Sequence, residues 1–161
     1  MKQIIYNEIM CKIEPDKIAA EWKETKHLVA SSFFFMVPAI YGFYNNLYLL
    51  PVVLLLTTLF SVNYWRHATY SWRRITDKTF AKISFTIFFI NGFVHVSRTV
   101  DLISMYTGLV GIIYCYYMSL KSYKNNIHNS NILVWWKYHM FFHLCVAYNQ
   151  LIIINSIVNK Y

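Results

Sequence analysis

The chain has 161 residues with a formal net charge of +8, and 57% of its residues are hydrophobic while only 14% are charged. Soluble domains carry charge on about a quarter of their residues, so this composition excludes an ordinary soluble domain and predicts a protein whose main partner is the lipid bilayer. The Lys and Arg residues occur in blocks between apolar stretches instead of forming one basic face, which argues against nucleic acid as a partner.

The first 27 residues are expected to form a charged cytoplasmic tail. They contain five Lys and five acidic residues but no continuous apolar core, so they do not have the pattern of a cleavable signal peptide. Ile5, Ile9 and Ile13 recur at helical spacing among charged residues, which is typical of an amphipathic helix lying on a membrane surface. A tail without fixed structure is the alternative interpretation.

Five apolar segments follow the tail, and each is long enough to cross a bilayer as a helix. They cover residues 28–44, 47–65, 80–97, 102–120 and 132–158. Pro38 and Pro51 lie inside the first two segments, where neighbouring helices can satisfy the carbonyl groups that a proline leaves free. The sequence therefore predicts an all-α fold, a transmembrane helical bundle of five spans over residues 28–158.

The distribution of basic residues predicts how the bundle is oriented, because short cytoplasmic loops carry the excess of Lys and Arg. Thirteen of the 15 basic residues lie in the tail, in residues 66–82 and around the loop between the fourth and fifth spans. The other two, Arg98 and Lys160, lie on the opposite side. This pattern places the N-terminus inside and the C-terminus outside, which requires an odd number of spans.

Polar side chains of three predicted spans come to one depth near the inner surface. His139 and His143 are four residues apart and therefore share one helical face. Ser61 and His67 lie at the inner end of the second span, and Asp77 lies just before the third. Three neutral imidazoles can hold zinc with a reactive water in the fourth position.

The predicted site therefore has His67, His139 and His143 as zinc ligands. Asp77 would be the catalytic acid or base that orients the water, and Ser61 would stabilise an oxyanion. At the depth of the headgroups such a site would act on an amide or ester bond of a lipid substrate. The expected function is thus a zinc-dependent intramembrane hydrolase.

Other interpretations stay open. Imidazoles near an interface also bond to Ser, Asn or backbone carbonyls of neighbouring helices, so the chain could be a non-catalytic scaffold or assembly protein with structural histidines. A channel or transporter is only weakly indicated, because no span carries a row of acidic residues. Cys11, Cys115 and Cys145 are far apart in the sequence and form no CxxC motif, so neither a disulfide framework nor a thiolate metal site is expected.

The order Ser, His, Asp and HxxxH along successive spans resembles the CREST superfamily of membrane hydrolases, which includes the alkaline ceramidases and the progestin and adiponectin receptors. The matching residues are Ser61, His67, Asp77, His139 and His143. The resemblance implies zinc as cofactor and a ceramidase-like amidase activity. The family usually spaces its Ser and His as SxxxH, and at that spacing this chain has Trp65. The loop "NYWRHATYSWRR" also resembles small multi-spanning membrane proteins of large DNA viruses, which implies no function.

Overall fold

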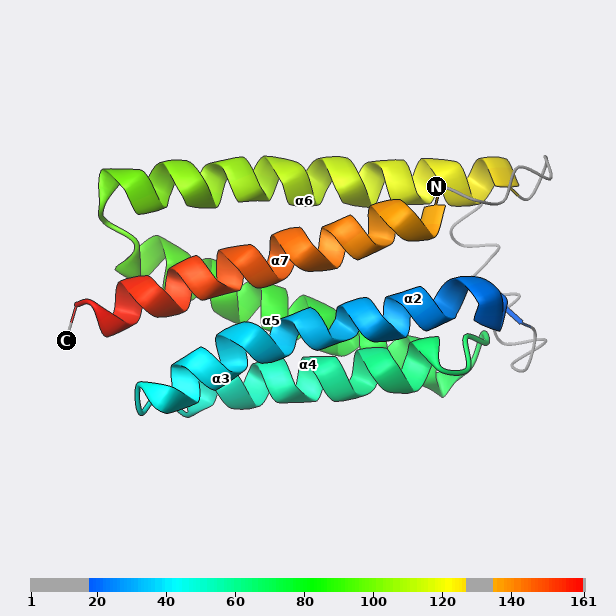
Figure 1. The fold of residues 1–161 in the computed structure, drawn as a ribbon, viewed down its shortest axis with the longest axis horizontal. Coiled ribbons are helices and arrows are strands. Elements are labelled where there is room, and N and C mark those ends of the chain that lie inside the picture. Colours follow the sequence, from blue (N-terminus) through cyan, green and yellow to red (C-terminus); the bar gives the residue numbers. More distant parts are fainter. Residues whose placement is uncertain (1–17, 127–134, 161) are drawn as a thin grey trace.

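The computed structural model describes residues 18–126 and 135–160, without the side chains of residues 124–126. Within these residues the predicted all-α class is confirmed, since extended pairing is limited to one isolated bridge between Ile18 and Thr69. The helical elements, shown in Figure 1, are α2 (Trp22–Ser32), the 3-10 helix η1 (Phe33–Phe35), α3 (Met36–Tyr44), α4 (Leu49–Trp65), α5 (Trp72–His95), α6 (Thr99–Asn126) and α7 (Trp135–Val158).

The described helices form five antiparallel passes, because α2, η1 and α3 continue one another as a single rod (Figure 1). Helix α7 lies in the centre and contacts α2, α3, α5 and α6. Helix α6 lies at one edge and packs along α7 (Figure 1). The first pass starts at one end of the bundle and the last finishes at the opposite end, as an odd number of passes requires.

Three of these passes are long and apolar enough to cross a membrane, namely Trp22–Tyr44, Thr99–Tyr123 and Trp135–Val158. Helix α4 is apolar but shorter, and α5 carries several charged residues in its first turns. The structure therefore supports a membrane protein by helix length and composition. The predicted amphipathic helix with Ile5, Ile9 and Ile13 lies outside the described residues, and so does the start of the fifth predicted span at residues 132–134.

The turn between the first two passes is tight because of the residue types at its corner. Asn46 adopts a left-handed conformation with φ of 59°, which Asn tolerates better than most residues. The backbone N–H of Leu47 donates to the carbonyl of Gly42 at 3.0 Å. A Cβ atom at Gly42 would lie 2.6 Å from Cγ of Pro51, so only glycine permits this approach of α3 and α4. Pro51 itself lies in the first turn of α4, where no intrahelical N–H bond is lost.

Two apolar clusters fill the interior, one at each end of the bundle. The first cluster includes Leu54, Phe88 and Ile154, together with other residues of α3, α4, α5 and α7. The second consists of Leu28, Tyr64, Trp65, Ala68 and Trp135. Along α2, α4 and α7 a few polar residues separate the members of one cluster from those of the other. The candidate site lies in this gap.

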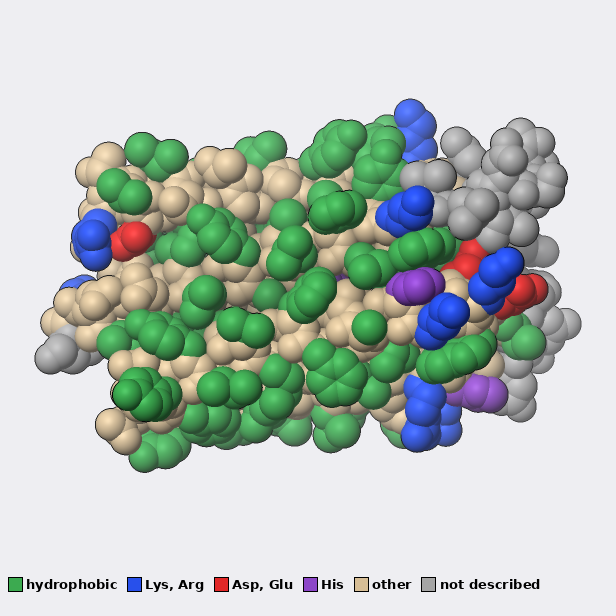
Figure 2. Space-filling view, viewed as in Figure 1, with side chains coloured by type: hydrophobic (Ala, Val, Ile, Leu, Met, Phe, Trp, Pro, Cys, Tyr) green, Lys and Arg blue, Asp and Glu red, His purple; other side chains and the backbone are tan. Residues whose placement is uncertain are grey.

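Basic side chains gather at the end of the bundle where α2 begins, which we call the basic end, while apolar side chains are spread along the rest of the visible face (Figure 2). The exposed apolar residues include Ile40, Leu59, Phe93 and Ile113. At the opposite end Arg98 forms an ion pair with Asp101, with 3.7 Å between Nε and Oδ2. The basic residues that the sequence assigns to one side of the bundle thus lie at one end of it.

Candidate functional site

Polar side chains from all five passes form a buried layer between the two apolar clusters, and we call it the polar layer. Its members lie nearer the basic end than the opposite end of the bundle. They are Ser31, Ser32, Ser61, Asp77, Ser119, His139 and His143.

The histidine pair forms the centre of the polar layer. His139 and His143 lie on successive turns of α7, with their ring centroids 4.9 Å apart and the rings nearly perpendicular. The Nδ1 atom of His143 is 2.9 Å from the hydroxyl of Ser31 on α2. The Nδ1 atom of His139 is 3.3 Å from the hydroxyl of Ser119 on α6. Each imidazole therefore connects α7 to a different neighbouring helix.

A second set of contacts connects α2, α4 and α5. The hydroxyl of Ser32 donates to the carbonyl of Leu28 at 2.8 Å, and its oxygen lies 2.9 Å from the hydroxyl of Ser61. Ser61 also interacts with the carboxyl group of Asp77. Ser61 therefore links Ser32 on α2 to Asp77 on α5.

The structure does not bring His67 to the histidine pair. His67 lies in the turn that follows α4 and is exposed to solvent, whereas His143 is buried. The side chain that reaches the pair from α4 is that of Trp65, whose ring centroid lies 5.0 Å from that of His139. Trp65 follows Ser61 by four residues, so both side chains lie on the same face of α4. His67 follows Ser61 by six residues and lies beyond the end of α4, so it does not share that face.

The described residues therefore do not fit the predicted zinc site. Within this part of the chain, no group of three or more His, Cys, Asp or Glu side chains is placed to hold a metal ion. The structure brings Ser61 to Asp77 and His139 to His143, and it connects these two pairs through Ser31 and Ser32. What the arrangement offers is a set of satisfied hydrogen bonds between helices.

Three members of the polar layer were missed by the sequence reasoning, namely Ser31, Ser32 and Ser119. The signal for Ser31 and Ser32 was present, because two adjacent serines in "VASSFFF" interrupt an otherwise apolar span. Polar groups inside a span need partners on neighbouring helices. Ser119 is one serine in a longer helix and gave no comparable signal.

Comparison of the sequence with protein-family models, with curated proteins and with solved structures gives no match. The resemblance to the CREST superfamily therefore stays a prediction that rests on the five residues quoted above.

Proposed function

We propose that the chain is a multi-pass membrane scaffold or assembly protein without catalytic activity, in which the polar layer fixes how the five passes pack. One observation carries this proposal: Trp65 packs against His139 at the place from which α4 would have to supply a third metal ligand. The two histidines are then structural groups.

The physics of helix packing in lipid supports this role. Apolar side chains are solvated by lipid as well as by each other, so contacts between helices depend on close packing and on hydrogen bonds. The hydrogen bonds of Ser31 with His143 and of Ser119 with His139 link α7 to α2 and to α6. Removing either imidazole leaves a serine without its partner in a buried place.

The proposal includes five crossings with the N-terminus inside and the C-terminus outside. The antiparallel order of the passes and the gathering of Lys and Arg at the basic end both support it (Figures 1 and 2). The basic end then faces the cytoplasmic side, where anionic lipids are enriched.

The zinc-dependent lipid hydrolase is the competing interpretation. It requires a third ligand beside His139 and His143, and His67 is on the exposed turn after α4. A hydrolase and a scaffold therefore differ in how stability depends on the two histidines and on zinc.

The same substitution at two histidines distinguishes a structural pair from a zinc site. His143→Ala should lower the apparent melting temperature by several degrees, since it leaves a cavity and removes the hydrogen bond between α7 and Ser31, at a cost of roughly 2–4 kcal/mol. His67→Ala removes an exposed side chain and should leave the melting temperature unchanged. A strong chelator should affect neither the parent nor the variants.

The hydrolase interpretation makes the opposite predictions for the same samples. A zinc ligand at His67 would make His67→Ala and the chelator destabilising. The parent would also hydrolyse a ceramide or a phospholipid ester in liposomes. His143→Ala and His67→Ala would both lose this activity. We expect no turnover that depends on either histidine.

A further inference from the structure

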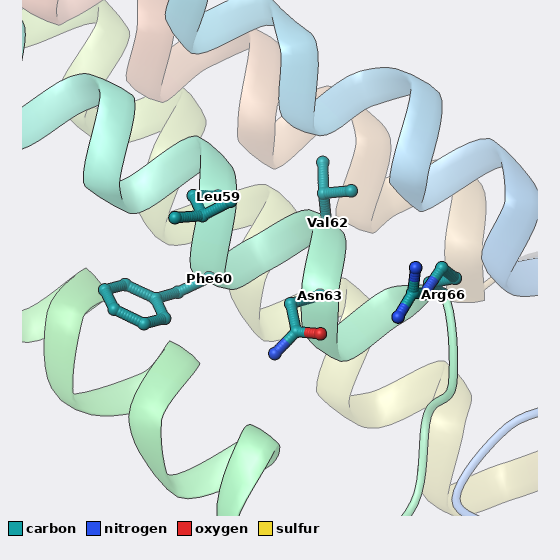
Figure 3. Close-up of a pocket in the computed structure, with 5 residues that line it drawn as sticks. All are labelled: Leu59, Phe60, Val62, Asn63 and Arg66. Carbon is teal, nitrogen blue, oxygen red and sulfur yellow. The ribbon is translucent and has the colours of Figure 1, made fainter.

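A shallow groove runs along α4 toward the basic end, beside α5. Figure 3 shows the five residues that line it, and its volume is about 280 Å³. These residues are Leu59, Phe60, Val62, Asn63 and Arg66. None of them belongs to the polar layer.

The groove changes from apolar to polar along the helix axis. Leu59 is 60% exposed, and the ring of Phe60 packs against Phe80 of α5 with 4.1 Å between centroids, so α5 holds one wall in place. Asn63 and Arg66 follow at the end nearest the turn after α4. From Leu59 to Arg66 the rise along the helix is about 10 Å. A phospholipid also changes from apolar to polar over a similar distance, between its acyl chains and its phosphate.

The charge at this end fits an anionic ligand. Arg66 is exposed, and no carboxylate of the described residues lies within ion-pair distance of it. Other Lys and Arg side chains gather at the same end of the molecule (Figure 2). A guanidinium group at the membrane surface attracts anionic headgroups by about 1 kcal/mol. A zwitterionic headgroup gains less, because its own ammonium group opposes the attraction.

We propose that this groove binds one anionic phospholipid of the inner leaflet. The guanidinium of Arg66 contacts the headgroup phosphate, the amide of Asn63 donates to a phosphate or ester oxygen, and one acyl chain lies along Leu59, Phe60 and Val62. The proposal rests on the orientation given above and not on the absence of catalysis, so a zinc-binding result leaves it standing.

The test measures lipid retention by native mass spectrometry on the full chain in mild detergent, with phosphatidylglycerol and phosphatidylcholine of identical acyl chains. We expect preferential retention of phosphatidylglycerol, lowered about fivefold by Arg66→Gln. Lys121→Gln removes the same charge from an exposed position on α6 and should retain the lipid as the parent does. Equal losses in the two variants, or no preference for phosphatidylglycerol, would overturn the proposal.

A second pair of measurements separates a lipid from a free anion. Leu59→Asn makes the acyl wall polar at an exposed position, so the fold is preserved, and it should weaken phosphatidylglycerol retention while leaving Arg66 in place. Inorganic phosphate at millimolar concentration should not displace the lipid. Displacement by phosphate together with full retention in Leu59→Asn would mean a simple anion site and would refute the phospholipid as occupant. Arg66→Gln and Leu59→Asn should melt at the temperature of the parent, which would confirm that both variants are folded.

Discussion

Trp65→His is expected to give a variant that binds about one zinc ion per molecule. The substitution places an imidazole on α4 where the indole now packs against His139, 5.0 Å between ring centroids. Zinc needs three or four such ligands with bonds of about 2 Å. Ser31 and Ser119 already bond to the Nδ1 atoms of His143 and His139, and such contacts orient imidazoles that bind a metal through the other nitrogen.

Trp65→Phe is the matched control, because it removes the same indole without adding a ligand. Both variants lose buried packing against Trp135, so both should melt below the parent. Addition of zinc should restore the melting temperature of Trp65→His alone, with zinc content measured by elemental analysis after desalting. Equal zinc content in the two variants would show that α4 does not approach the histidine pair at residue 65.

Gly108→Leu should separate α6 from α7. A Cβ atom at Gly108 would lie 2.6 Å from the amide group of Asn149, closer than side chains pack, and a leucine extends further, so the Asn149 side chain must shift or the helices must move apart. Overpacking of this kind costs roughly 1–3 kcal/mol or more. Because α7 is the main neighbour of α6, the substitution should also weaken the contact of Ser119 with His139.

Cross-linking of two cysteines reports this separation directly. Cys115 on α6 is a free thiol close enough to Cys145 on α7 to interact with it. In a Cys11→Ser background, a thiol oxidant should join them in the parent, and Gly108→Leu should abolish most of the product. Gly111→Ala is the milder control, since its Cβ would meet Sγ of Cys145 at 3.2 Å. An undiminished cross-link in Gly108→Leu would contradict the packing of α6 on α7.

The pattern of apolar residues along the chain was sufficient to predict the helices. Helix α4 (Leu49–Trp65) ends at the residue where the second predicted span ends, and α7 ends at Val158 as expected. Helix α2 begins at Trp22, six residues before the first predicted span, because a helix does not end where its sequence becomes polar. Hydropathy measures the apolar part of a helix and therefore underestimates its length.

The sequence predicts the depth in the bundle at which the site residues lie. It does not predict which helical faces turn toward one another. Loop charges and helix rise place Ser61, Asp77 and the histidine pair at one level, and the structure brings them into a common polar layer. Which face of each helix turns inward depends on packing between helices, which a single sequence does not specify. For this reason the sequence points to His67 as a ligand, whereas in the structure Trp65 is the residue of this segment that packs against His139. The approach of Cys115 to Cys145, far apart in the sequence, was missed for the same reason.

The zinc content of the parent protein tests the central claim most directly. The full chain, purified in mild detergent with zinc in the growth medium and then desalted, is analysed for metal beside the His139→Ala/His143→Ala double variant. A structural histidine pair predicts far less than one zinc per chain in both samples. One zinc per chain in the parent, lost in the double variant, would contradict the account and favour the hydrolase.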